Sequence, residues 1–287
     1  MRARGAVPVS ILLGALSIIA AACGSSSPRA QTQTQSRPST SRVTTSTTVA
    51  PSSTARPTTT TTTSPPTVAT TTQPPATAAP PTTAPAPLLV TQLSDIGSAQ
   101  QVITVAADGY GTHVATLTAY QRDGSAWRTV FGPWTASVGR NGVAPPGEKS
   151  EGDGRTPSGT YGFDFMFGTN PNPGVQFPFR TITGTNIVWD DDSASPNYNR
   201  WIDTNTESAG TSPEPMYVRA YRWGAVIAYN RARTPGLGSA IFLHLATAAS
   251  TAGCVALPQD QLLSLLRWLD PARQPRIAIG TLEALTS

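Results

Sequence analysis

GSAIFLHLATAASTAGCVALP, residues 238–258, carries the clearest fold signal in the chain. Its run Ile241-Phe242-Leu243 is apolar at consecutive positions, a pattern typical of a central strand that is buried on both faces. His244 continues the strand towards its end, and a loop of small residues follows it. We therefore predict a strand over 240–245 in the middle of a sheet, with a loop at its carboxyl end.

The rest of the chain from Leu88 has the pattern of a mostly β domain. Strand-like runs alternate with turn residues, and Asp123-Gly124 predicts a tight hairpin turn. Four leucines at helical spacing after Pro258 predict one main flanking helix, which Asp270-Pro271 ends. Residues 88–287 are enough for one compact domain. The predicted strands are 102–106, 113–121, 127–131, 159–165, 185–189, 225–229, 240–245 and 276–280.

The first 23 residues have the pattern of a bacterial lipoprotein signal peptide. Arg2 and Arg4 precede an apolar run, 7–20, that is too short to span a bilayer. The run ends in Ala20-Ala21-Ala22-Cys23, which resembles a lipobox, so Cys23 is the expected lipidation site. The expected product is an exported protein that acyl chains hold at the outer face of the cytoplasmic membrane. Plain secretory cleavage is the alternative.

Residues 24–87 have the composition of a linker. They are almost entirely Thr, Pro, Ser and Ala, without an acidic or aromatic side chain. Such a segment cannot bury enough apolar surface to offset the entropy of ordering, so we expect it to be disordered and extended, reaching into the cell wall. The expected organisation is a signal peptide over 1–23, this linker, and a folded domain over 88–287 with its core at about 101–280.

The charge balance argues against a nucleic-acid-binding protein. The net charge is +4 and the pI is near 9.4, but charged residues make up 13% of the chain and form no Lys/Arg stripe with interleaved aromatics. Weak attraction to an anionic cell envelope is the interpretation that this balance favours.

Cysteine and histidine are scarce, and one of each falls in the 238–258 segment. If Cys23 is lipidated, Cys254 has no disulfide partner and is either an inert core residue or a reactive thiol. His244 could fold back to bond this thiol, lower its pKa and give a thiolate at neutral pH. Gly253 leaves room for a substrate backbone and for amides that face an oxyanion, and Thr251 carries a hydroxyl nearby. The residues alone leave both interpretations open.

Several other polar and aromatic residues have ordinary structural interpretations. His113 is expected to be a half-buried sheet residue, and Asp190-Asp191-Asp192 a solvated acidic loop. Trp201 and Tyr229 could line a substrate groove, although aromatic residues in β domains mostly pack in the core.

Two motifs, in this order, resemble those of the L,D-transpeptidase catalytic domain, whose fold is often called YkuD-like. Gly152–Tyr161 (GDGRTPSGTY) resembles the family's GDGRTPxGxY/F-type element. His244 followed by Thr251-Ala252-Gly253-Cys254 resembles its His and S/T-x-G-C pair. Tyr198-Asn199-Arg200-Trp201 and 239–244 are similar to segments of actinobacterial members. The resemblance covers about 101–280 and implies a β-sandwich or mixed sheet with one main flanking helix.

The resemblance implies a two-step acyl transfer on peptidoglycan stem peptides. Cys254 is the expected nucleophile, and it attacks the carbonyl between the third residue, a diamino acid, and the D-Ala at position four. His244 is the expected base and then acid, and the amides of Gly253 and Cys254 are the expected oxyanion donors. An amine of a neighbouring stem then gives a 3→3 cross-link that serves cell-wall organisation and cell shape. No cofactor and no metal is implied, and a monomer is expected.

The chain departs from the family pattern at two positions. Ala252 stands where many members have His, and Ala256 where many have Arg. Arg155 or Arg219 is the expected replacement for the lost cation, and Arg155 and Tyr229 are the expected substrate-binding residues. Three alternatives stay open: an L,D-carboxypeptidase or a wall-attachment ligase that uses the same Cys–His pair, or a wall-binding module without turnover.

Overall fold

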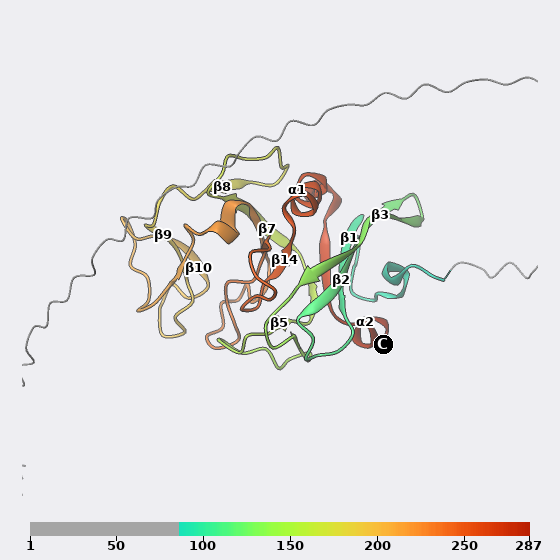
Figure 1. The fold of residues 1–287 in the computed structure, drawn as a ribbon, viewed down its shortest axis with the longest axis horizontal. Coiled ribbons are helices and arrows are strands. Elements are labelled where there is room, and N and C mark those ends of the chain that lie inside the picture. The colour runs from blue at the N-terminus through green and yellow to red at the C-terminus, as the bar shows by residue number, and fades with distance from the viewer. Residues whose placement is uncertain (1–85) are drawn as a thin grey trace, which may run out of the picture. The chain divides into compact units, whose positions relative to one another are not determined.

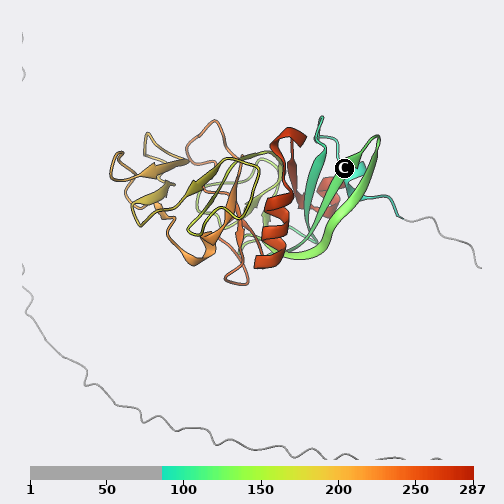
Figure 2. The same cartoon turned by 90° about the horizontal axis from the view of Figure 1, so that it is seen from above.

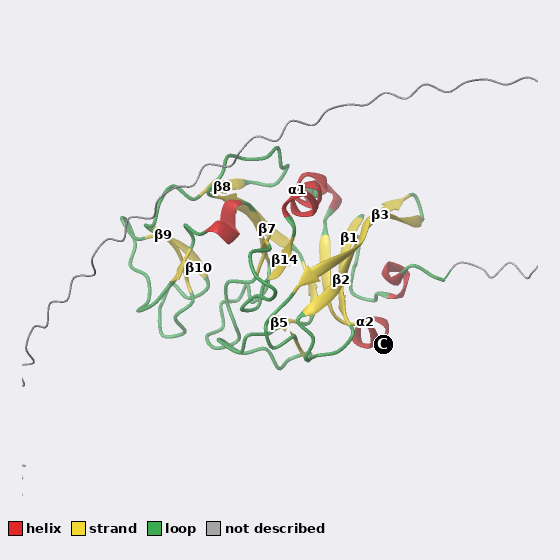
Figure 3. Ribbon diagram, viewed as in Figure 1, coloured by secondary structure: helices red, strands yellow, loops and turns green. Residues whose placement is uncertain are grey.

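The computed structural model describes residues 86–287. The signal peptide, Cys23 and all but the last two positions of the linker lie outside the described residues. The described part is mostly β with few, short helices, as predicted (Figure 3). None of the helices in this part is long and apolar enough to cross a membrane.

A curled, mixed sheet of ten strands forms the body of the domain (Figure 1). These strands are β1 (Gln101–Ala107), β2 (Val114–Asp123), β3 (Ala126–Ser137), β6 (Gly159–Tyr161), β7 (Phe163–Gly168), β8 (Phe179–Thr181), β12 (Gly224–Ile227), β13 (Phe242–Leu245), β14 (Val255–Leu257) and β15 (Arg276–Thr281). Their order is β6-β15-β1-β2-β3-β14-β13-β12-β7-β8. The strand predicted over 240–245 is therefore an interior strand, β13, as expected.

Smaller elements complete the domain. One pair of strands is β4 (Val143–Ala144) with β5 (Thr156–Pro157), and a three-stranded sheet is β10 (Arg200–Asp203), β9 (Ile187–Asp190) and β11 (Glu214–Pro215). The helices are α1 (Gln259–Trp268), α2 (Leu282–Thr286) and the short 3₁₀ turns η1 (Leu89–Gln92), η2 (Arg219–Arg222) and η3 (Pro271–Arg273). The β9–β10 pair and the β1–β3 strands lie at opposite ends of the domain (Figures 1 and 2).

The two strongest local signals are confirmed. Asp123 pairs with Ala126 across the β2–β3 hairpin, which leaves a two-residue loop with Gly124 at a φ of 59°. Glycine adopts this left-handed conformation without steric cost, which is why the dipeptide predicts the turn. Helix α1 begins after Pro258, and its apolar stripe packs against β12, β13 and β14. The buried leucines of this stripe are Leu262, Leu265 and Leu266, followed by Leu269.

Strand β13 separates two apolar layers because its side chains alternate between the faces of the sheet. Leu243 and Leu245 belong to the main core together with the leucines of α1. Phe242 points to the other face, where it packs with Trp189 of β9 and with Met216 just beyond β11. His244 follows Phe242 on that same face. The functional side chains of β13 therefore lie on the side of the small sheet, away from α1.

Several predicted strands differ in detail. Strand β13 begins at Phe242 rather than at Ala240, β12 ends at Ile227 rather than at Tyr229, and β3 continues to Ser137. The strand expected over 159–165 is broken at Gly162: β6 pairs with β15, whereas β7 pairs with β12 at the other end of the sheet. The strand expected from Thr185 begins at Ile187. His113 precedes β2 and is exposed, so the prediction of a half-buried sheet residue was wrong. Its backbone carbonyl accepts a hydrogen bond from the amide of Val138.

Candidate active site

A parallel strand pair brings His244 and Cys254 together. Leu243 pairs with Val255 and His244 with Ala256, so β13 and β14 run side by side in register. Cys254, directly before β14, therefore lies beside Phe242 and two positions from His244 on the same face. Phe242 and Cys254 belong to one apolar cluster. Backbone pairing, and not the connecting loop alone, sets the approach of the imidazole to the sulfur.

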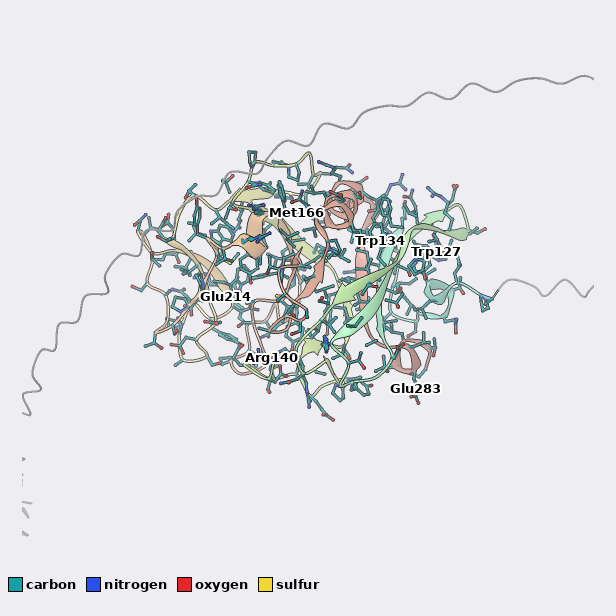
Figure 4. All side chains as sticks on the ribbon, in the orientation of Figure 1. Trp127, Trp134, Arg140, Met166, Glu214 and Glu283 are labelled. Atoms are coloured by element: carbon teal, nitrogen blue, oxygen red, sulfur yellow. The ribbon has the colours of Figure 1, made fainter. Side chains whose placement is uncertain are left out.

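Both side chains line a cavity of about 320 Å³. Loops from four regions of the chain close it: 140–152, 191–221, 239–244 and 247–256. Figure 4 labels two of its lining residues, Arg140 and Glu214, which come from well-separated parts of the ribbon. The lining is polar, with cations and carboxylates both present. A peptide entering this cavity meets the thiol and the imidazole together.

The thiol of Cys254 is held by backbone groups. Its Sγ accepts a hydrogen bond from the amide of Phe242 at 3.3 Å and donates one to the carbonyl of Ala240 at 3.2 Å. The residue is 5% exposed, and Tyr221 and Phe242 pack in the same cluster. Ala240 has a φ of 53°, a conformation that costs free energy for a residue with a Cβ. The sulfur therefore sits in a defined position at the cavity wall. Its hydrogen bonds go to backbone groups and not to His244, so the thiol–imidazole bond expected from the sequence is not formed in this structure.

The imidazole of His244 has a fixed orientation. Its Nδ1 lies 2.9 Å from the carbonyl oxygen of Leu245, which can only accept, so Nδ1 carries the proton and donates it. The other ring nitrogen, Nε2, is then the free base. Tyr221 packs edge-on against the ring, with 5.3 Å between centroids. The carbonyl of Leu245 is the group that selects the tautomer, which the sequence did not reveal.

Burial makes the resting pair neutral. Desolvation, with a smaller effect from Glu214, raises the pKa of the Cys254 thiol, although the Phe242 amide and Lys149 oppose this. Desolvation also lowers the pKa of His244 to about 4, against a small opposite effect of the Leu245 carbonyl. The expectation of a resting thiolate was therefore wrong, because the burial of both groups outweighs the favourable contacts.

Two threonines organise the turn that presents Cys254. Thr251 Oγ1 donates to the carbonyl of Cys254 at 2.7 Å and accepts from the amide of Gly253 at 3.1 Å. Thr156 Oγ1, fully buried in β5, donates to the same carbonyl at 3.2 Å and accepts from Gly139 at 2.8 Å. The hydroxyl of Thr251 thus shapes the turn rather than contacting the sulfur. Thr156 ties the GDGRTP segment to the nucleophile.

The predicted oxyanion donors differ in their availability. The Gly253 amide already donates to Thr251, whereas the Cys254 amide forms no hydrogen bond within residues 86–287. A Cβ at Gly253 would lie 3.0 Å from the carbonyl oxygen of Arg155, so the close approach of these two loops requires glycine. Of the two expected donors, the Cys254 amide is the one that is free.

Arg155 and Arg219 do not line the thiol cavity, whereas Arg140 and Lys149 do. Lys149 is buried and donates to Asp153 at 2.8 Å and to the carbonyl of Ser150 at 2.6 Å. Since Lys149 is paired with Asp153, Arg140 is the cation of this lining that has no ion pair among residues 86–287 and could bind a carboxylate. Nothing in the sequence indicated these two residues beyond their place in a Gly/Pro-rich loop.

Glu214 and Tyr221 are further cavity residues that the sequence did not indicate. The phenol of Tyr221 donates to Oε1 of Glu214. Burial raises the pKa of Glu214 to about 7, with the Tyr221 hydrogen bond acting in the opposite direction. Both residues reach the cavity through long-range folding, since they precede Cys254 by more than thirty positions.

The acidic triplet is only partly solvated, contrary to the prediction. Asp190 is fully buried and accepts from the Ser195 hydroxyl at 2.6 Å and from the Gly210 amide at 3.0 Å. Asp191 lines the thiol cavity. Asp192 accepts hydrogen bonds from the amide and the hydroxyl of Thr211. Within residues 86–287 no cluster of His, Cys, Asp and Glu side chains is arranged to hold a metal ion.

Tyr229 and Trp201 lie away from the thiol cavity and line a second cavity together. Tyr229 also packs edge-on against Tyr161, with 5.5 Å between ring centroids. Tyr229 is therefore not one of the residues that line the cavity around the thiol.

Comparisons with known proteins identify the family. No curated protein matches the sequence significantly. Among solved structures, the helical cell shape determining protein Pgp2 from Campylobacter jejuni is similar at 13% identity, with a TM-score of 0.30. That alignment covers 69% of this chain and 60% of the other, so the chain spans about three fifths of that relative's length. The family model for the L,D-transpeptidase catalytic domain, YkuD, matches residues 104–279, which is well over half of the 287 residues. The chain therefore belongs to the YkuD family of L,D-transpeptidase catalytic domains.

Proposed function

We propose that this protein is a peptidoglycan L,D-transpeptidase that forms 3→3 cross-links, with Cys254 as nucleophile and His244 as base. Membership of the family implies L,D-transpeptidase-type activity on peptidoglycan, and hence a place of action outside the cytoplasm. One observation carries the residue assignment: the thiol and an imidazole with a free Nε2 line the same cavity from adjacent parallel strands.

In the proposed reaction the proton moves as the sulfur attacks. His244 Nε2 takes the thiol proton while Sγ bonds to the carbonyl between the diamino acid and D-Ala, and the Cys254 amide donates to the oxyanion. The C–N bond breaks, and His244 returns the proton to the departing D-Ala amine. The amine of a second stem then attacks the thioester, His244 accepts its proton, and the thiol is restored. Because both groups start neutral, no charge separation has to be maintained before substrate arrives.

The test uses protein from Gly24 onward, incubated with disaccharide-tetrapeptide and analysed by product mass. We expect cross-linked dimers from the wild type and no product from Cys254→Ala or His244→Ala. His113→Ala is the matched control, because this exposed histidine lies outside the cavity, and it should keep full activity. Undiminished dimer formation by Cys254→Ala would contradict the assignment of Cys254 as the nucleophile.

Product identity separates the related functions. Tripeptide monomers without dimers indicate an L,D-carboxypeptidase, and transfer to a protein amine indicates a wall-attachment ligase. A carbapenem adduct on Cys254, seen by intact mass, argues against a wall-binding module without turnover. The three enzymatic functions use the same nucleophile, Cys254, and differ in the acceptor that resolves the thioester.

We also propose that Cys23 carries the lipid anchor, that residues 24–87 form the linker, and that 88–287 is a monomeric catalytic unit. The small residues before Cys23 and the composition of 24–87 support this organisation. Replacing Cys23 by Ala should move the protein from the membrane fraction to the soluble fraction. Unchanged membrane retention would contradict the anchor.

A further inference from the structure

A second cavity, of about 450 Å³, adjoins the thiol cavity. It lies between β7 and β12 of the large sheet and the β9–β10 pair. Ile241 lines both cavities. Most of its lining consists of four arginines and four aromatic residues: Arg180, Arg200, Arg231, Arg233, Phe165, Trp189, Trp201 and Tyr229.

The lining of this cavity carries more positive than negative charge. Asp164 is its one acidic lining residue, and Arg231 Nε donates to it at 2.8 Å. Arg200 lies 3.2 Å from Glu207. Arg180 and Arg233 form no ion pair with any carboxylate among residues 86–287. Two guanidinium groups are therefore left to bind an anion, and guanidinium favours carboxylates because its donors match both oxygens.

Aromatic rings fix one of these cations and provide an apolar wall. The guanidinium carbon of Arg180 lies 3.9 Å from the ring centroid of Phe165 and 5.9 Å from that of Trp201. Phe165 and Trp201 meet edge-on, with 5.8 Å between centroids. An arginine stacked in this way is held in place without being neutralised. The cavity thus offers a positioned cation beside surface that suits the aliphatic part of a peptide.

The wall between the two cavities also holds the nucleophile. Asn199, which lines the second cavity, accepts a hydrogen bond from the Ala240 amide at 3.3 Å. The Ala240 carbonyl in turn accepts from the Cys254 thiol. A ligand in the second cavity is therefore separated from the reacting sulfur by the backbone of 240–241.

We propose that the second cavity binds the terminal carboxylate of the acceptor stem peptide, through Arg180 and Arg233. The proposal rests on the transpeptidase function above and names the binding site of its second substrate. The donor stem occupies the thiol cavity, where Arg140 supplies a cation without an ion pair among residues 86–287. In the acceptor, the attacking amine belongs to the diamino acid and the carboxylate to the D-Ala that follows it. Ile241, which lines both cavities, is where such an acceptor passes from one to the other.

The experiment compares wild type with Arg180→Gln, Arg233→Gln and the double variant. Both arginines are exposed, so these variants should fold normally. Arg128→Gln, an exposed arginine in the β2–β3 hairpin, is the matched control for lost charge. Each protein is given the donor disaccharide-tetrapeptide together with an acceptor tetrapeptide, either as the free acid or as its C-terminal amide. Two quantities are measured: the rate of carbapenem adduct formation on Cys254, and the ratio of dimers to hydrolysed tripeptide.

We expect adduct formation to be unchanged in all variants, because the donor side is intact. With the free-acid acceptor, the dimer-to-tripeptide ratio should fall about tenfold for each arginine removed, the effect of losing a charge-assisted hydrogen bond. With the amide acceptor the variants and the wild type should give the same low ratio. Arg128→Gln should behave as wild type with both acceptors.

Three results overturn the proposal. One is an unchanged ratio in the double variant with the free acid. Another is inhibition by poly(glycerol phosphate) that the double variant abolishes, with no preference for acid over amide, which assigns the cavity to a phosphate polymer. The third is a wild type that forms the carbapenem adduct but no dimer with either acceptor. If the wild type forms no adduct at all, the proposed function itself fails, and the acceptor site fails with it.

Discussion

At the scale of single residues, the neutrality of His244 and Cys254 is the feature with the clearest chemical consequence. A histidine whose pKa lies at about 4 is a competent base throughout the range in which an ordinary histidine is still partly protonated. Burial raises the pKa of the Cys254 thiol, so in the proposed reaction the proton leaves as the sulfur begins to bond. A neutral thiol is also less open to oxidation than a thiolate.

This neutrality predicts the pH dependence of acylation. The rate of carbapenem adduct formation should decline only as the pH falls towards about 4, where Nε2 of His244 becomes protonated. It should be nearly constant between about pH 5 and 8, since neither group changes its charge there. Time courses of intact mass across this range measure the rate. Half-maximal acylation near pH 6.5 would show instead that the imidazole titrates like a solvated histidine.

At the scale of elements, β5 and the turn before β14 depend on each other. The carbonyl of Cys254 accepts from two hydroxyls, Thr156 in β5 and Thr251 in the turn. The amide of Thr251 donates to the carbonyl of Val138 beyond β3, and its carbonyl accepts from Arg140. The nucleophile is thus held from both neighbouring segments. This explains why the two sequence motifs occur together although about ninety residues separate them.

Replacing Thr156 by Val should weaken this connection. The substitution preserves the shape of a fully buried side chain but leaves the Gly139 amide without its acceptor, which costs about 1–3 kcal/mol. We expect the free energy of unfolding in urea to decrease by this amount and carbapenem acylation to slow several-fold. Thr129→Val, on an exposed position of β3, is the control and should change neither quantity. Equal stability of Thr156→Val and wild type would contradict the proposed tie.

At the scale of the whole molecule, two buried groups, Glu214 and His244, have opposite effects on the free energy of unfolding as the pH changes. The folded pKa of Glu214, about 7, is above its ordinary value, so its contribution is full below about pH 4.5 and is lost as the pH rises to about 7. The folded pKa of His244 is below its ordinary value, so its contribution is present above pH 6.5 and is lost as the pH falls to about 4. Each group changes the free energy of unfolding by about 3 kcal/mol over its range. Between about pH 4 and 7 the two changes have opposite signs and nearly cancel.

Glu214→Gln should remove one of these opposing effects. The amide keeps an oxygen for the Tyr221 phenol but has no charge to bury. Urea unfolding should find the variant more stable than wild type by about 3 kcal/mol at pH 7.5 and equal to it at pH 4.5. Glu283→Gln in the exposed helix α2 is the control. A variant that follows the wild type at both pH values rules out a buried, raised Glu214.

The sequence predicted those parts of the fold that local chemistry determines. The Asp123-Gly124 turn, the leucine stripe of α1 and the apolar run of β13 each have a signal within a few residues. Strands β4, β5, β8, β10, β11 and β14 were missed because they are two to four residues long and depend on their partners. In the site, spacing and motif pointed to His244 and Cys254. Lys149 and Glu214 come from remote segments, a loop and the short strand β11, so no spacing in the sequence could have indicated them.

The parallel pairing of β13 and β14 has a consequence for how such a protein can diversify. The pairing of β13 with β14, extended by the hydrogen bond from the Ala246 amide to the Leu257 carbonyl, sets the separation of the imidazole and the thiol. Residues 247–250 are therefore not needed to keep these two groups in reach of each other. That short span can be lengthened, trimmed or rewritten, and the entrance to the sulfur reshaped with it, while the two side chains stay where they are. Related proteins can therefore differ in what reaches the sulfur without a change in the strands that carry the pair.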